Sequence, residues 1–221
     1  MRESVPKPQQ LIPILKQLHE GASSPTGKFG FPVTTYKGYF PLQCSWCDSW
    51  EEFFSRQFRA ELAWEAGIRG ANLELEQLTE ELFAKVIPRL LRPLQTGGRT
   101  IKPTLCHGDL WQGNVEIDVS THQPILYDSC AVYAHNEFDL SLFRAPRYLL
   151  NKSHVDEYRK EVGVSEPIDD FDDRNALYAL RNDMVVSALW NSRTVELRAK
   201  SIEEMKRLIA KFPQGINNCD G

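Results

Sequence analysis

The stretch that decides the fold reads Leu105-Cys106-His107-Gly108-Asp109-Leu110-Trp111-Gln112-Gly113-Asn114, and Ile125-Leu126-Tyr127-Asp128 follows it. A short apolar run precedes the histidine. Two strand-like runs, residues 113–118 and 124–127, are separated by the polar turn 120–123. We therefore expect a strand, a tight loop and a hairpin, with acidic and amide side chains at the ends of the loop.

Three of these side chains suit phosphoryl transfer, a reaction that depends mainly on placement and charge. Asp109 lies in the loop, where a carboxylate can orient a hydroxyl group and accept its proton. Asn114 and Asp128 offer oxygen ligands of the kind that Mg²⁺ prefers, and the hairpin should bring them together. Ordinary alternatives are a turn residue for Asp109 and a loop-end cap for Asn114. We expect the His107 ring to brace the loop backbone.

The rest of the chain is mainly helical in pattern. The helix that begins near Ser49 has a capping box with Glu52, and Pro13 is placed in the first turn of the first helix. Residues 31–47 are expected to be irregular with short extended pieces. The expected helices cover residues 6–20, from 49 onward, 73–92, 137–150, 153–162, 173–191 and 201–211. The fold class is therefore mostly α with a small β-hairpin (α+β).

Composition narrows the class of protein. The chain has 221 residues, 42% of them hydrophobic and 25% charged, which predicts one soluble domain over residues 1–221. A net charge of −4 argues against nucleic-acid binding, and no apolar run is long enough for a membrane span. Five scattered cysteines favour a reducing, cytoplasmic setting. Cys44 and Cys47 are interpreted as two loop thiols, since no second pair of zinc ligands follows.

The motif is more particular than a general kinase loop. HGDLWQGN at residues 107–114, followed by PILYDSCAVYAHNEFDLSLFR at 124–144, resembles the pattern HGDLWxGN…DPxxxYGHxEYELA of the fructosamine kinase (ketosamine-3-kinase) family. The likeness continues in LIPILKQLHEG (11–21), KFGFPVTTYKG (28–38), SWEEFFSRQ (49–57) and DFDDRNALYALRNDMVVSALW (170–190). The chain departs from the pattern at Ser129, Ala134 and Phe138, and in the helix segment Met184 to Trp190.

The resemblance implies a protein-kinase-like fold of the aminoglycoside-phosphotransferase type, with this chain as its C-terminal lobe. The catalytic loop would be residues 105–114, the metal-binding end of the hairpin 125–128, and the remainder helical. Asp109 would be the catalytic base, and Asn114 and Asp128 would ligate Mg²⁺. The side chains implied to brace the site or line its substrate pocket are His107, Trp111, His135, Glu137 and Asp139.

The implied reaction is the ATP-dependent phosphorylation of the 3-hydroxyl of a ketosamine, free or protein-bound, so that ATP and a sugar-amine are the expected partners. A kinase grips ATP with a Gly-rich loop and a strand lysine that precede the catalytic loop. Neither motif is present here, so we expect an absent N-terminal lobe, no small-lobe ATP contacts and impaired activity. We also expect association through the apolar surface which that lobe would cover.

Two alternatives stay open. One is another phosphotransferase, of the aminoglycoside or choline kinase type. The other is a non-catalytic lobe that binds a sugar-amine or a protein partner. An unrelated metal-dependent hydrolase is disfavoured, because the sequence lacks a histidine-rich or multi-carboxylate metal set.

Overall fold

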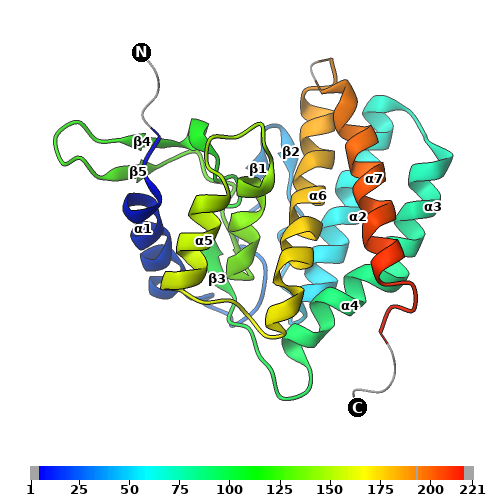
Figure 1. Ribbon diagram of the computed structural model, residues 1–221, viewed down its shortest axis with the longest axis horizontal. Coiled ribbons are helices and arrows are strands. Elements are labelled where there is room, and N and C mark those ends of the chain that lie inside the picture. Colours follow the sequence, from blue (N-terminus) through cyan, green and yellow to red (C-terminus); the bar gives the residue numbers. More distant parts are fainter. Residues whose placement is uncertain (1–4, 193, 217–221) are drawn as a thin grey trace. The chain divides into compact units, whose positions relative to one another are not determined.

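The computed structural model describes residues 5–192 and 194–216, so the fifth cysteine, Cys219, and the tail 217–221 lie outside the described residues. The chain forms two compact units (Figure 1). The first unit comprises Met1–Asp48 and Lys102–Ser165, and the second comprises Ser49–Ile101 and Glu166–Gly221. The interpretation of residues 1–221 as one domain stays a prediction.

The first unit combines short strands with two α-helices that pack against each other. Its helices are α1 (Pro8–Gly21), η3 (Gln112–Asn114), η4 (Asn136–Arg144) and α5 (Lys152–Glu161). Its strands are β1 (Tyr36–Lys37), β2 (Phe40–Pro41), β3 (Thr104–Cys106), β4 (Val115–Ile117), β5 (Pro124–Leu126) and β6 (Val132–Ala134). They pair as three antiparallel two-stranded sheets, β1–β2, β3–β6 and β4–β5.

The first helix forms where its apolar spacing predicts it, and Leu11, Ile12 and Leu15 are fully buried. Its first turn begins at Pro8, whose fixed φ suits that position. Pro13 therefore lies inside the helix rather than in its first turn, which corrects the prediction.

The expected hairpin is β4–β5, in which Val115 pairs with Leu126, and it extends away from the helices of its unit in Figure 1. Strand β6 was not expected. It pairs with β3 so that Cys106 faces Val132. A three-residue strand carries too little periodicity to be recognised, and its partner lies far along the chain. Hence the pattern predicted one hairpin where the structure has three small sheets.

The predicted helix 137–150 is also wrong in part. Residues Asn136–Arg144 form 3₁₀ turns, and no helix continues to residue 150. Ala145 takes an extended conformation, with φ −78° and ψ 122°. The following Pro146 explains this, because proline disfavours the helical region for the residue before it and has no N–H to donate.

In the second unit, all regular structure of the described residues is helical. Its elements are α2 (Trp50–Arg69), α3 (Leu73–Glu81), the π-helix η1 (Leu82–Val86), α4 (Ile87–Leu91), η2 (Arg92–Gln95), η5 (Ile168–Asp170), α6 (Phe171–Leu189) and α7 (Val195–Lys211). Ser49 caps α2 as predicted, since its side chain accepts from the Glu52 N–H. The predicted helix 73–92 is interrupted by the π turn and continues past Pro93 as a 3₁₀ turn.

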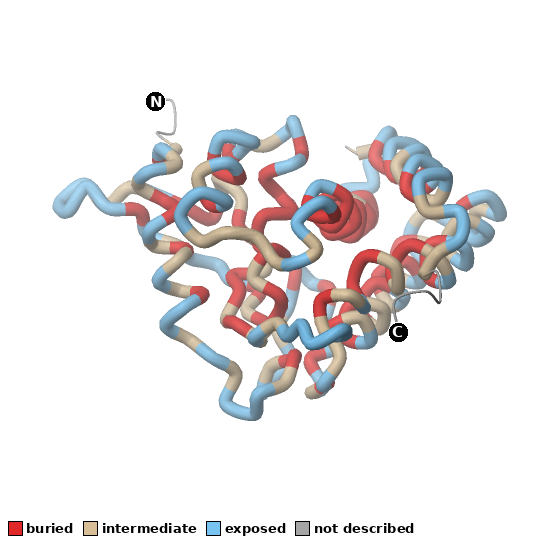
Figure 2. The backbone as a smooth tube through the Cα atoms, turned by 60° about the horizontal axis from the view of Figure 1, so that its bottom comes forward, coloured by how far each residue is buried: buried red, intermediate tan, exposed pale blue. Residues whose placement is uncertain are grey.

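Each unit has its own core. In the second unit, the Trp50 indole N–H donates to the Tyr178 hydroxyl over 2.8 Å, which satisfies both polar groups inside an aromatic cluster. Buried and exposed residues alternate along most helices (Figure 2), as amphipathic packing requires. Among the described residues, no helix is both long and apolar enough to cross a membrane.

Candidate active site

The loop that follows β3 makes its turn at a glycine. Gly108 has φ +79°, and a Cβ atom there would lie 2.2 Å from the Cys130 carbonyl oxygen. Both the backbone conformation and the close approach exclude a side chain. The glycine therefore allows the loop to turn tightly after Cys106, so that Asp109 follows directly at the surface of the first unit.

Asp139 holds the buried side of this loop. Its two carboxylate oxygens accept hydrogen bonds from the His107 and Gly108 backbone N–H groups, each over 2.7 Å. Burial by itself raises the pKa of Asp139. The hydrogen bond and charge of His19, together with the hydrogen bond from the Gly108 N–H, outweigh burial and hold the pKa below its ordinary value. The ionised carboxylate thus stabilises the two peptide groups that precede Asp109.

The His107 ring ties the loop to the hairpin. Its Nε2 lies 2.9 Å from the Tyr127 carbonyl, which can only accept, so this nitrogen carries the proton. Its Nδ1 then accepts from the Asp109 N–H over 3.3 Å. The ring is buried. These contacts are those of a bracing group, and they join the start of the loop to the end of β5.

The Asp109 carboxylate is held by two side chains. Its Oδ1 lies 3.3 Å from the Lys37 ammonium of β1, and its Oδ2 accepts from Asn114 Nδ2 over 3.2 Å. Its side chain is 23% exposed, whereas that of Lys37 is only 3% exposed. The base candidate therefore keeps part of its surface open while both oxygens are oriented.

The Asn114 side chain connects the two aspartates proposed for the site. Its Nδ2 also donates to the backbone carbonyls of Asp109 and Asp128, over 2.8 and 3.3 Å. With the amide nitrogen directed at these oxygens, its Oδ1 is the atom that could ligate a metal. Asp128 is exposed and has φ +54°. The neutral amide oxygen of Asn114 and the carboxylate of Asp128 are ligand types that fit Mg²⁺, which takes few protein ligands and keeps several waters.

The other candidates have different surroundings. The Trp111 indole covers Gly113, where a Cβ atom would lie 2.4 Å from the ring, and it packs beside Tyr148. His135 and Glu137 are fully buried, and both bond Ser165. The His135 Nε2 lies 2.8 Å from its hydroxyl, and Glu137 accepts from its N–H over 2.7 Å. These two side chains therefore brace the segment around Ser165.

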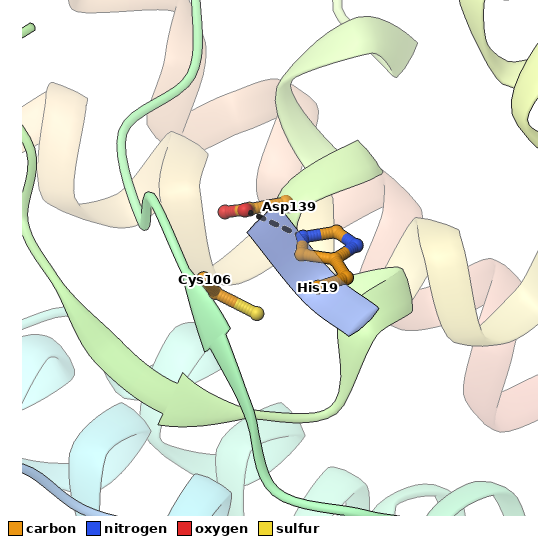
Figure 3. Close-up of side chains that lie close together, drawn as sticks. All are labelled: His19, Cys106 and Asp139. Carbon is orange, nitrogen blue, oxygen red and sulfur yellow. Dashed lines mark hydrogen bonds and ion pairs between the residues drawn. The ribbon is translucent and has the colours of Figure 1, made fainter. Parts of the chain in front are cut away.

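His19, Cys106 and Asp139 form a buried cluster that resembles a metal site in its residue types (Figure 3). The polar atoms of the ring and carboxylate are already engaged, however. His19 Nε2 donates to Asp139 over 3.1 Å, and its Nδ1 lies 2.7 Å from the Tyr158 hydroxyl. Burial, and then the nearby Asp139, raise the pKa of the Cys106 thiol well above its ordinary value, which opposes the thiolate that a metal needs. The cluster is best described as a brace.

Two residues at the site escaped the sequence analysis as functional candidates. His19 lies in the matched stretch LIPILKQLHEG, and a histidine at the end of an amphipathic helix could have been questioned as a buried group. Lys37 also lies in a matched stretch, KFGFPVTTYKG, but nothing in the pattern indicated burial, because a lysine in a short hairpin is usually exposed. The Cys44 and Cys47 side chains are buried, and no disulfide joins the cysteines at 44, 47, 106 and 130.

Comparison with known proteins identifies the fold and the family of the chain. The chain is 37% identical to mouse ketosamine-3-kinase over 115 residues, which is 52% of this chain and 35% of the mouse protein. The match thus spans about a third of the length of that relative. The fold of this chain is similar to the crystal structure of a protein described as a fructosamine-3-kinase from Thermobifida fusca. The TM-score is 0.71, with 22% identity over 95% of this chain and 68% of that one.

A weaker likeness extends to a thermostable mutant of an aminoglycoside phosphotransferase, with a TM-score of 0.53 and 13% identity over 97% of this chain and 72% of that one. The fold is therefore a mostly helical part of the fructosamine kinase and aminoglycoside phosphotransferase fold, as expected. The family model described as fructosamine kinase matches residues 3–208. Since this match takes in nearly all of the chain, the chain belongs to the fructosamine kinase family.

Proposed function

We propose that this chain carries the catalytic residues of an ATP-dependent kinase that phosphorylates the 3-hydroxyl of ketosamines, free or protein-bound. The observation that carries the proposal is the placement of Asp109. Its carboxylate is partly exposed and held from two sides, and it shares the Asn114 amide with Asp128. Family membership supplies the substrate class.

In this proposal, Asp109 orients the sugar hydroxyl and accepts its proton as the hydroxyl attacks the terminal phosphoryl group of ATP. Lys37 and Asn114 hold the two carboxylate oxygens, so little reorientation is needed during the reaction. Asp139 and His107 contribute indirectly, because their hydrogen bonds fix the backbone on either side of Gly108 and thereby position Asp109.

Asn114 and Asp128 would hold Mg²⁺, which when bound neutralises charge on the phosphates of the nucleotide. Trp111, packed over Gly113 and beside Tyr148, would form an apolar wall for the sugar. We further propose a cytoplasmic location. It is supported by the absence of disulfides among the four described cysteines.

The test is a mass-spectrometric assay with Mg-ATP and a fructosyl-lysine or ribulosyl-lysine peptide. We expect a phosphate adduct on the sugar, and a rate about 10²–10⁴-fold lower for Asp109→Asn. Circular dichroism of both proteins establishes that they are folded. A folded wild-type chain that leaves every peptide unmodified at high concentration would refute the proposal and favour the non-catalytic binding lobe.

A parallel reaction with an aminoglycoside in place of the peptide addresses the other alternative. Phosphorylation of the aminoglycoside, with the glycated peptides unchanged, would move the chain to that class of phosphotransferase. The same Asp109→Asn variant serves as control, because the base is needed in either case.

A further inference from the structure

A buried lysine next to a proposed catalytic base requires an explanation. Lys37 lies in a two-residue strand whose neighbour Tyr36 is 56% exposed, yet its own side chain is only 3% exposed. Lysine on a surface hairpin normally keeps its ammonium group in water, since a buried charge is costly unless paired. Here the ammonium turns inward and forms an ion pair with Asp109.

The hairpin that carries Lys37 is built to place it. Gly38 takes φ +58° in the tight turn between β1 and β2, and Lys37 pairs with Phe40, which is buried. The Leu42 N–H donates to the Thr35 carbonyl over 2.9 Å and closes the base of the hairpin. The lysine is therefore delivered by a strand anchored in the unit, rather than by a free loop.

In the proposed reaction, a bound metal ion and the substrate hydroxyl would both be attracted to the Asp109 carboxylate. Asp109 and Asp128 are bound to the same Asn114 amide, one through a carboxylate oxygen and the other through its backbone carbonyl. Hard divalent cations favour carboxylate ligands. A cation at Asn114 and Asp128 would compete with the substrate hydroxyl for the Asp109 carboxylate, which would then be lost as a base.

We propose that Lys37 is a positioning residue whose ion pair keeps the Asp109 carboxylate out of the ligand set of the metal and so reserves it for the substrate hydroxyl. The inference rests on the proposed function for the identity of the reaction. Its prediction concerns metal binding, however, and can be measured without turnover.

The experiment measures Mn²⁺ binding to the full chain, with free Mn²⁺ quantified by electron paramagnetic resonance. Mn²⁺ prefers the same oxygen ligands as Mg²⁺. With Lys37 in place, the Asp109→Asn substitution should change the dissociation constant for Mn²⁺ by less than about 3-fold. The Asp128→Asn substitution should weaken Mn²⁺ binding by about 10-fold or more. Weakening of the same size in both variants would overturn the inference.

The Lys37→Met variant should change the Mn²⁺ affinity in the opposite direction. With the ammonium group removed, Asp109 can join the ligand set, and we expect Mn²⁺ to bind about 10-fold more tightly. Lys37→Arg keeps the charge and should stay close to the wild type. Damage to the fold would weaken binding, so a gain cannot come from a merely structural role.

Two further variants test whether tighter Mn²⁺ binding comes from coordination by Asp109 or from the loss of a positive charge alone. The gain should vanish in the double variant Lys37→Met/Asp109→Asn. It should be absent from Lys28→Met, which removes a cation from the exposed Lys28–Asp48 pair of the same unit. A gain that persists in the double variant, an equal gain in Lys28→Met, or no Mn²⁺ binding by either wild type or Lys37→Met would each overturn the inference.

Turnover in the same preparations distinguishes the two proposals. If the wild type phosphorylates the glycated peptide, Lys37→Met should lower kcat by about 10–100-fold, change KM by less than about 3-fold, and recover with Lys37→Arg. A fall confined to KM would contradict the positioning role. Absence of phosphorylation by the wild type, with the Mn²⁺ results as expected, would refute the proposed function and leave the metal-exclusion role standing.

Discussion

Asp139 and Asp109 are two carboxylates at one loop, and they differ in burial and in their hydrogen-bond partners. Asp139 is buried and accepts hydrogen bonds from two backbone N–H groups and from His19. Asp109 is partly exposed, and within the described part of the chain its carboxylate oxygens contact the side chains of Lys37 and Asn114. The first fixes the backbone, whereas the second remains open to a ligand.

The difference teaches how a rigid loop can present a reactive group. Backbone N–H groups are fixed donors, so a carboxylate bound to them fixes the conformation of the loop. Side-chain partners can be displaced by a substrate or a metal at smaller cost. The buried side of the loop should therefore carry its stability, and the exposed side its chemistry.

The largest effect is expected from Asp139→Ala. The change removes the acceptor of the buried His107 N–H, of the partly buried Gly108 N–H and of the His19 ring, and should lower the free energy of unfolding by about 3–5 kcal/mol. Urea denaturation followed by circular dichroism measures this. Asp128→Asn is the matched control, since Asp128 is exposed and asparagine tolerates its positive φ; it should stay within about 0.5 kcal/mol of wild type. Equal losses in both variants would remove the contrast.

Gly108→Ala should come next. Alanine there is strained at φ +79° and its Cβ collides with the Cys130 carbonyl, so we expect a loss of about 3 kcal/mol. Gly163 is the matched control for the backbone strain alone, because it has φ +89° but open space around the added Cβ. Gly163→Ala should cost only about 1 kcal/mol. A Gly108→Ala variant no less stable than Gly163→Ala would show that the loop can move away from Cys130.

Tyr158→Phe tests how far the brace extends from the loop. Its hydroxyl meets both the His19 ring and the Asn136 amide over 2.7 and 2.8 Å. Removing the hydroxyl leaves the buried His19 ring and the partly buried Asn136 amide short of a partner and should cost about 1–2 kcal/mol by thermal or urea unfolding. The loss should shrink when His19 is already replaced by phenylalanine. Strict additivity in this double-mutant cycle would separate Tyr158 from the brace.

The smallest effect is expected from pH. The pKa of Asp139 is lowered in the folded state, so its ionised form contributes stability that is present above its unfolded value of about 3.9. This contribution is lost as the pH falls below that value through the folded pKa. The stability difference between wild type and Asp139→Asn should therefore narrow on acidification below about pH 4. A difference that stays constant to pH 2 would mean that Asp139 is not ionised in the folded protein.

Much of the site could be predicted because its residues are close in sequence. The HGDLWQGN loop and the hairpin after it are local, so the turn glycine, the strands and the approach of Asn114 to Asp128 follow from short-range patterns. The family could be identified from the same motif, and the match over residues 3–208 confirms it. The particular roles of Asp109, Asn114 and Asp128 stay predictions that the assays above decide.

The long-range partners could not be predicted in the same way. Strand β6 exists because it pairs with β3. The 3₁₀ segment η4 ends at the extended Ala145, which precedes Pro146, so no long helix forms. The contact between Lys37 and Asp109 joins residues far apart in the chain. No local pattern carries such information, since tertiary burial decides which way a side chain turns.

The sequence by itself thus determined the family, the mostly helical class, and the chemical groups at the ends of one loop, because these depend on local spacing and residue type. Only the tertiary structure decided that Asp139 faces the backbone while Asp109 faces solvent, and that a buried lysine stands beside the latter. The physical reason is that hydrogen-bond and charge partners in a core are chosen by position in space. A polar group removed from water must find its partner wherever the packed chain provides one.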